Sequence, residues 1–170
     1  RQLPCAFATA VDCLNQLLAE YDPQLVIATG LGPGRSDISI ERVAINLNDA
    51  RIPDNLGAQP IDTPVIVGGP AAYFSTLPVK AMVKAVREAG IAASVSHTAG
   101  TFVCNQVFYS LQHALAGSGV RSGFIHVPGL PGQGAEPSMA LATTVEGLRV
   151  AVLAAWATPR DIAESGGQVC

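Results

Sequence analysis

The sequence predicts an α/β fold with one domain, in which a twisted, mostly parallel central sheet is flanked by helices on both faces. Short, continuously apolar runs such as Gln24–Gly30 and Gly123–Val127 are typical of strands buried on both faces of a parallel sheet. These runs alternate along the chain with longer segments of helical periodicity. The chain has 170 residues, of which 49% are apolar, so we expect a single domain spanning residues 1–170.

The first part of the chain begins with a helix. The apolar residues of Thr9–Tyr21 fall on one helical face, and the segment ends at Asp22. The buried strand Gln24–Gly30 follows, and a Gly/Pro turn separates it from Ile38–Asp49. That segment alternates apolar and polar residues, which predicts one strand with a bulge at the change of phase near Glu41.

The middle of the chain starts with a proline-containing connection. The segment Ala50–Leu77 holds four prolines, so we expect it to be mostly irregular and on the surface. A helix follows, with Pro78 in its first turn, apolar residues on one face and Gly90 at its end. The run Ile91–Ser96 is predicted to be a short buried strand.

The remaining segments continue the alternation of helix and strand. A helix begins near Val103, where apolar residues start to recur every four positions, and the strand Gly123–Val127 follows it. A long final helix is predicted over roughly Ser138–Trp156. Its apolar stripe, expected to face the core, consists of Leu141, Val145, Leu148, Val152 and Leu153.

Composition argues against several functional classes. Charged residues make up 14% of the chain, the net charge is −3, and Lys and Arg are scattered singly, so nucleic acid is not an expected partner. No apolar run reaches the ~18 to 20 residues of a membrane span, and no signal segment is visible, so we expect a cytoplasmic protein. The widely spaced cysteines suggest neither a disulfide framework nor a metal site. These cysteines are Cys5, Cys13, Cys104 and Cys170.

Cys104 is the first candidate for chemistry. It follows the strand Ile91–Ser96 and lies in the first turn of the next helix, and in open α/β sheets the working site lies where strands lead into helices. The helix dipole and the free amides favour a thiolate there, so we expect the pKa of Cys104 to lie below the ~8.5 of an ordinary thiol. The same amides are suited to hold an oxyanion.

His126 and Glu41 complete a candidate catalytic group. His126 ends the strand in "GFIHVP", which places it at the same sheet edge as Cys104, and a thiol beside a histidine forms a nucleophile–base pair. Glu41 is a carboxylate in the apolar strand "SIERVAIN", where orienting a histidine would compensate for its burial. Each residue also has a structural explanation: a small core cysteine, a hydrogen-bonded core histidine, and a solvated edge glutamate paired with Arg42.

Four longer segments carry a resemblance to a known family. "GTFVCN", "GFIHVP", "GPAAYFSTLPVKAMV" and "ERVAINLNDARIPDN" resemble pyroglutamyl peptidase I, also called pyrrolidone-carboxylate peptidase, and the similarity runs from about Leu3 to Trp156. That family consists of cytosolic cysteine peptidases that remove an N-terminal pyroglutamyl residue from peptides. The resemblance therefore implies a pyroglutamyl peptide as substrate, a thioester intermediate, no metal or organic cofactor, and assembly into homo-oligomers.

The resemblance also assigns roles to individual residues. It implies that Cys104 is the nucleophile, that His126 is the general base and then the acid, and that Glu41 orients the imidazole. Arg51, in "NDAR", matches a family arginine that would help neutralise the oxyanion. Phe102 matches an aromatic residue that packs against the pyrrolidone ring, although plain core packing also explains it.

The chain departs from the family pattern at the substrate pocket. It enters that pattern roughly 40 residues late, judged from typical element lengths, and contains no counterpart of the family's first strand and "GFEPF"-like loop. We expect an upstream or neighbouring segment to supply them. Leu31 stands where many relatives have a glutamine, and the segment after His126 is shorter than usual. These departures leave two alternatives open: a catalytically silent relative that acts as a binding or scaffold protein, and a cysteine amidase of different specificity.

Overall fold

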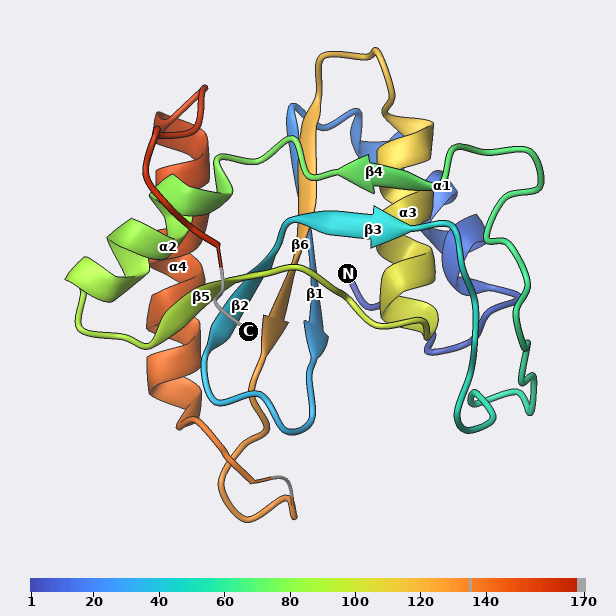
Figure 1. Ribbon diagram of the computed structural model, residues 1–170, viewed down its shortest axis with the longest axis horizontal. Helices are drawn as coiled ribbons and strands as arrows, with labels where there is room; N and C mark the ends of the chain where they lie inside the picture. Colours follow the sequence, from blue (N-terminus) through green and yellow to red (C-terminus); the bar gives the residue numbers. More distant parts are fainter. Residues whose placement is uncertain (135, 168–170) are drawn as a thin grey trace.

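The computed structural model describes residues 1–134 and 136–167, and in it a mixed sheet lies between two layers of helices (Figure 1). The sheet has the strand order β1-β6-β2-β5. Its strands are β1 (Leu25–Leu31), β2 (Ile38–Glu41), β5 (Ala93–Ser96) and β6 (Arg121–Val127). The helices are α1 (Ala10–Tyr21), α2 (Val79–Glu88), α3 (Val103–Ala114) and α4 (Leu141–Ala157).

The strand directions confirm the predicted fold class. β1 runs parallel to β6, and β2 runs parallel to β5, while β2 and β6 are antiparallel. The two short apolar runs singled out in the sequence are β1 and β6, which lie side by side in the sheet. In their register Gly30 pairs with His126, and on the other side of β6 Ser39 of β2 pairs with His126. Three strands therefore meet around His126.

One face of the sheet is covered by α2 and α4, and their packing corrects one prediction. α2 buries the predicted apolar face, including Met82 and Val86, which have no exposed surface. α4 does the reverse: its buried residues are Thr144, Gly147, Ala151 and Ala155. Most of the predicted stripe is exposed, namely Leu141, Val145, Val152 and Leu153. The small residues let α4 approach the sheet closely, because Gly147 faces the side chain of Ile38, which would collide with any Cβ there.

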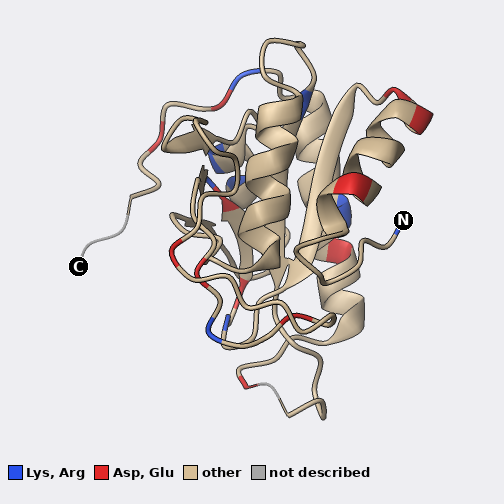
Figure 2. Cartoon of the chain, turned by 90° about the vertical axis from the view of Figure 1, so that its right-hand side faces the viewer, with Lys and Arg blue, Asp and Glu red and all other residues tan. Residues whose placement is uncertain are grey.

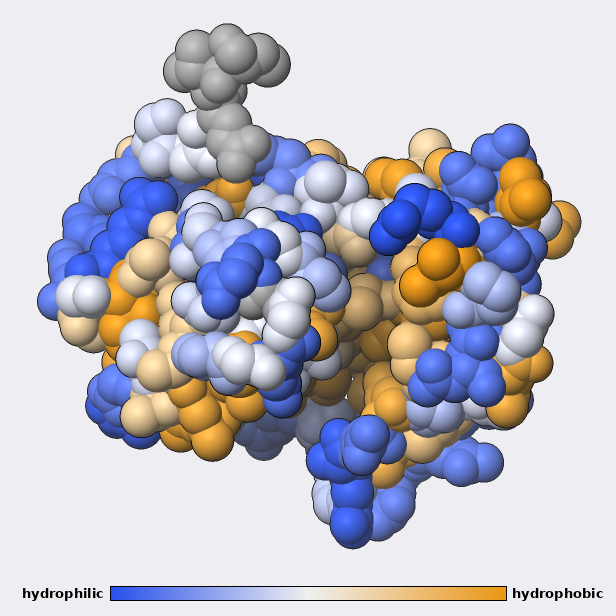
Figure 3. All heavy atoms as spheres, turned by 90° about the horizontal axis from the view of Figure 1, so that it is seen from below, coloured by the Kyte–Doolittle hydropathy of each residue, from blue (hydrophilic) through white to orange (hydrophobic). Residues whose placement is uncertain are grey.

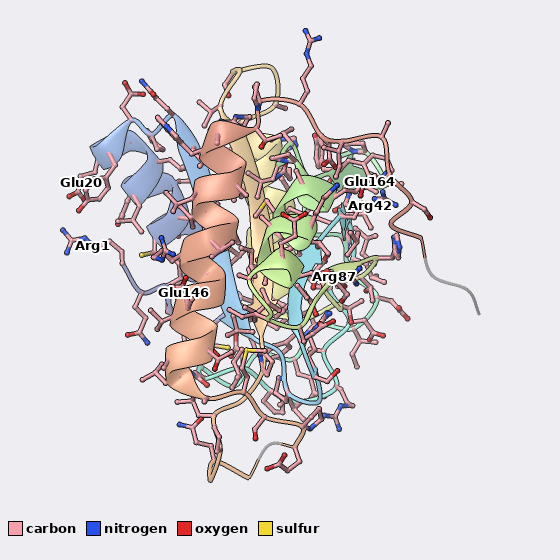
Figure 4. All side chains as sticks on the ribbon, turned by 90° about the vertical axis from the view of Figure 1, so that its left-hand side faces the viewer. Arg1, Glu20, Arg42, Arg87, Glu146 and Glu164 are labelled. Carbon is pink, nitrogen blue, oxygen red and sulfur yellow. The ribbon has the colours of Figure 1, made fainter. Side chains whose placement is uncertain are left out.

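The outer side of α4 is visible in Figure 4, where Glu146 lies on the surface of the helix. Its carboxylate pairs with Arg149 one turn along, at 2.6 Å.

None of the helices in the described part of the chain is long and apolar enough to cross a membrane. In the view of Figure 2 the lysine and arginine residues appear as short, separated segments.

The opposite face of the sheet is covered by α1 and α3, with α3 almost entirely enclosed. Its aromatic residues Phe108 and Tyr109 are fully buried, and they pack with Phe124 of β6 and Leu14 of α1. α3 also buries amide side chains that hold neighbouring backbone. The Asn105 side chain accepts a hydrogen bond from the Ile45 amide at 3.0 Å and donates to the Leu47 carbonyl at 3.0 Å.

The prediction of one bulged strand over Ile38–Asp49 is wrong, because the chain leaves the main sheet at Arg42. The Arg42 amide still donates to the Ser96 carbonyl at 2.8 Å, but its own carbonyl accepts from the Ser75 amide at 2.9 Å. Beyond it, β3 (Val43–Ile45) pairs with β4 (Ala72–Phe74) in a separate two-stranded sheet beside α3. β4 lies in the segment predicted to be mostly irregular, Ala50–Leu77. The prolines of that segment gave no indication of so short a strand.

Candidate active site

Cys104 lies in the first turn of α3, as the sequence predicts, and its thiol packs against the end of β1. The thiol sulfur would be 3.1 Å from a Cβ placed on Gly30, and the Phe124 ring would be 2.9 Å from the same atom. Glycine at this position therefore makes room for the thiol. Because Gly30 pairs with His126 in the sheet, the Cys104 thiol packs on the strand next to the one that carries His126.

His126 and Glu41 form a buried hydrogen-bonded pair. The imidazole Nδ1 lies 2.7 Å from the Glu41 Oε1, the Glu41 side chain has no exposed surface, and His126 is 4% exposed. With a carboxylate as acceptor, Nδ1–H is the donor, which leaves Nε2 to exchange protons with a nucleophile. The structural alternative of a solvated Glu41 paired with Arg42 is wrong, since Glu41 is sealed in and its cationic partner is a different arginine.

That partner is Arg35, which the sequence reasoning did not single out. Its Nη2 lies 2.9 Å from the Glu41 Oε1 and donates to the Thr98 carbonyl at 2.9 Å, while its Nη1 donates to the Ser96 hydroxyl at 3.1 Å. A signal was present in the sequence, because a buried carboxylate requires a cation or several donors. Arg35 follows directly on the Gly/Pro turn after β1, where it is well placed to supply one.

The predicted low pKa of Cys104 is wrong. Burial, together with the neighbouring Cys5 and Glu41, raises the pKa of the Cys104 thiol to about 11. The Arg35 cation and a backbone hydrogen bond at the helix start act in the opposite direction, but burial outweighs them. The thiol is therefore protonated at neutral pH, so a base has to remove its proton for it to attack.

Phe102 and Arg51 are the two predicted substrate-binding residues, and the structure gives them different surroundings. Phe102 directly precedes α3, and its ring meets that of Phe7 edge-on, with centroids 5.2 Å apart. Arg51 is exposed and forms no ion pair with another described residue. The chain just before Arg51 is held against the loop that precedes α3, because the Asp49 amide donates to the Thr101 carbonyl at 3.0 Å. The functional roles of both residues remain predictions.

The surface around these strand ends is hollowed. Figure 3 views the molecule from the side at which β1 and β6 end, and it shows a depression between two halves whose depth is lined by apolar, tan and orange surface. Leu31, the last residue of β1, is 52% exposed, next to Gly30.

Three of the four cysteines are free thiols, namely Cys5, Cys13 and Cys104. The fourth, Cys170, lies outside the described residues.

Known proteins share both the sequence and this architecture. Residues 1–158 match the pyroglutamyl peptidase family. A pyrrolidone-carboxylate peptidase of Pseudomonas fluorescens is 76% identical over 172 aligned positions, which cover 99% of this chain and 81% of the relative. One of Cupriavidus taiwanensis is 58% identical over 99% of this chain and 82% of the relative.

Solved structures agree with these matches. The pyroglutamyl peptidase I of Bacillus amyloliquefaciens superposes with a TM-score of 0.92 at 40% identity, covering 96% of this chain and 80% of that structure. The pyrrolidone carboxyl peptidase of Thermococcus litoralis gives a TM-score of 0.92 at 39% identity, with coverage of 96% and 81%. The chain thus belongs to the pyroglutamyl peptidase family.

Proposed function

We propose that this chain is a cysteine peptidase that hydrolyses the amide bond following an N-terminal pyroglutamyl residue of peptides. The observation that carries this proposal is the arrangement at the strand ends: the Cys104 thiol packs on Gly30, whose strand partner His126 is hydrogen-bonded to the buried Glu41. Membership of the family supports the choice of substrate. The reaction requires no metal or organic cofactor, because thiol, imidazole and water supply all its steps.

The reaction starts from a protonated thiol. His126 takes the Cys104 proton as the sulfur attacks the pyroglutamyl carbonyl, and the carbonyl oxygen becomes an oxyanion. Backbone amides at the start of α3 are available to stabilise that negative charge. The imidazolium then protonates the departing amine, which leaves a thioester on Cys104. Water activated by the same imidazole hydrolyses the thioester and regenerates the thiol.

Glu41 acts on this cycle through His126. Its carboxylate fixes the imidazole in the tautomer that carries a proton on Nδ1, and its negative charge stabilises the imidazolium formed in each half of the reaction. Both partners are buried, so solvent screens this interaction little.

Substrate recognition is assigned to the first turn of α3 and its surroundings. A lactam ring has no charged amine, so a small apolar pocket with a few polar anchors suits it. We assign Phe102 to contact with that ring and Arg51 to the neutralisation of the oxyanion, as the resemblance implies. The apolar hollow at the strand ends supports this assignment (Figure 3).

Cytoplasmic location and assembly into homo-oligomers are parts of the same proposal. Both follow from the family resemblance, and the exposed apolar side chains of α4, such as Leu153 and Trp156, provide surface that a second subunit would cover. Light scattering of the purified protein measures the assembly state.

A fluorogenic pyroglutamyl amide tests the activity, with the corresponding alanyl amide as a comparison. We expect the reduced protein to release the fluorophore from the pyroglutamyl compound only, and we expect Cys104→Ala to abolish release. Cys13→Ala is the matched control, because Cys13 is another partly buried helical cysteine, located in α1. Absence of turnover by the reduced protein would favour a binding role, and preference for the alanyl amide would indicate a different amidase.

A further inference from the structure

We infer that Arg35 is a positioning residue that orients the Glu41 carboxylate and tunes how tightly the His126 imidazole holds its proton. This inference rests on the proposed function of Cys104, His126 and Glu41. It goes beyond that function because Arg35 touches neither the thiol nor, in the proposed reaction, the substrate: it acts through Glu41.

The two partners of Glu41 share one oxygen. The Arg35 Nη2 at 2.9 Å and the His126 Nδ1 at 2.7 Å both meet Oε1. The second oxygen, Oε2, is buried and has no hydrogen-bond partner among the described residues. The guanidinium therefore fixes the orientation of the carboxylate toward the imidazole, since tilting the group away would lose both contacts at once.

Arg35 also ties the carboxylate to the segment that leads to the nucleophile. Besides Glu41, it contacts the Ser96 hydroxyl at the end of β5 and the Thr98 carbonyl in the loop before α3. Its side chain is 25% exposed, so it is held largely out of solvent. Gly32 makes room for it, because a Cβ at that position would be 2.6 Å from the Arg35 Cδ. A single side chain thus joins the loop after β1, the end of β2 and the approach to α3.

The charge of Arg35 opposes the charge of Glu41. Two groups contact this carboxylate: Arg35 from the loop after β1 and His126 from β6. Cys104 from α3 interacts with it electrostatically. Removing the cation leaves the full negative charge acting on the imidazole, which then holds a proton to higher pH. It also removes one of the influences that lower the pKa of the Cys104 thiol. Both changes reduce the amount of free base and of thiolate at neutral pH.

The test compares Arg35→Met and Arg35→Lys with Arg42→Met, a neighbouring arginine outside this cluster. Turnover of a pyroglutamyl amide is measured from pH 5 to 10, together with the pH dependence of Cys104 alkylation by iodoacetamide. We expect Arg35→Met to lower kcat by about 10²-fold with KM nearly unchanged, because misalignment affects the reacting groups rather than binding. The acid limb of kcat/KM and the alkylation curve are both expected to move upward by about one pH unit.

Arg35→Lys separates charge from geometry. It keeps the cation but cannot span Glu41, Ser96 and Thr98 together, so we expect the wild-type pH limbs with a kcat between those of Arg35→Met and the wild type. Wild-type profiles in Arg35→Met, or a lower kcat with unmoved pH limbs in both variants, would overturn the inference. If Arg35→Met does not fold, a wild-type kcat in Arg35→Lys would overturn it instead. Failure of the proposed function is a separate outcome, since the unmutated protein would then show no turnover, while the alkylation curves would still test the charge effect.

Discussion

The end of β2 holds a fully buried ionisable group and the first turn of α3 a partly buried one, and their surroundings differ. At the end of β2, the Glu41 carboxylate meets a guanidinium and an imidazole on one oxygen. In the first turn of α3, burial raises the pKa of the Cys104 thiol to about 11. The carboxylate is therefore held between two nitrogen donors, whereas the thiol keeps its proton at neutral pH.

Magnitudes explain why the helix dipole does not ionise Cys104. A helix N-terminus stabilises an anion by about 0.3–1 kcal/mol, whereas each unit of pKa corresponds to about 1.4 kcal/mol. A rise of the Cys104 pKa to about 11 exceeds what the dipole offers. Glu41 differs because its partners lie within hydrogen-bond distance, and such contacts offset desolvation directly.

Removing the charge at the end of β2 is expected to have the largest effect. Glu41→Gln keeps the shape but leaves His126 without an anion and Arg35 without its partner, so we expect kcat to fall by about 10³- to 10⁴-fold. The free energy of unfolding is expected to fall by about 3 kcal/mol, because the partly buried Arg35 cation loses its counter-charge. Steady-state kinetics and urea denaturation measure the two effects.

Glu164→Gln is the matched control for that variant. Glu164 also pairs with a cation, Lys84, at 2.6 Å, but about half of its side chain is exposed (Figure 4). We expect neither kcat nor the unfolding midpoint to change measurably. Equal effects of the two substitutions would remove the distinction between the buried and the exposed pair.

Moving the thiol rather than the charge is expected to have the next largest effect. Gly30→Ala places a Cβ 3.1 Å from the Cys104 sulfur and 2.9 Å from the Phe124 ring, so the ring and the sulfur have to shift away from β1. We expect kcat to fall by about 10²-fold and stability by about 1–3 kcal/mol from overpacking. Gly167→Ala is the control, because nothing lies within 4 Å of a Cβ there. Wild-type kinetics in Gly30→Ala would show that the thiol position is not critical.

The protonation of the thiol is open to direct observation. Because the pKa of Cys104 is about 11, the fraction of thiolate at pH 7 is on the order of one in 10⁴. We expect its alkylation by iodoacetamide, followed by peptide mass spectrometry, to keep accelerating above pH 9. Exposed Cys5 in the same sample provides the comparison. A Cys104 rate that levels off near pH 7 would mean that a preformed thiolate exists.

A smaller effect is expected from changing Asp54, which holds the chain that packs against the start of α3. The Asp54 carboxylate accepts hydrogen bonds from the amides of Phe7 at 2.7 Å, Leu56 at 2.8 Å and Ala58 at 2.9 Å. These hydrogen bonds outweigh desolvation and hold the pKa of Asp54 below its usual value, so the stability they provide is present above the unfolded pKa and is lost as the pH falls through the folded one.

We expect Asp54→Asn to lower the melting temperature at pH 7 and to flatten the loss of stability below pH 4. A change in kcat of only a few-fold is expected, because Asp54 reaches the site only through Phe7 and its contact with Phe102. An acid-unfolding curve identical to that of the wild type would contradict this assignment.

Local pattern predicted the elements, whereas long-range packing decided the details that the sequence missed. The positions of Cys104 and His126 followed from strand ends and a helix start, which neighbouring residues determine. The orientation of α4 did not, because the close fit of Gly147 on Ile38 outweighed the larger apolar side chains. The split of β2 from β3 depends on hydrogen bonds of Arg42 with residues distant in the sequence.

The charge state of the site could not be predicted from the local sequence pattern either. The sequence places Cys104 at a helix start but does not show how deeply the thiol is buried. It likewise contains Arg35 and Glu41 six positions apart without showing that the chain turns back between them to join their side chains. Such contacts are visible only once the sheet order β1-β6-β2 is known.

Trapping the acyl-enzyme shows which cysteine attacks the substrate. The protein is mixed with excess pyroglutamyl ester, quenched in acid within the first turnover, digested and mapped by mass spectrometry. We expect one pyroglutamyl group on the peptide that carries Cys104, and none in Cys104→Ser. A pyroglutamyl group on Cys5 instead, or continued turnover without any modified cysteine, would contradict it.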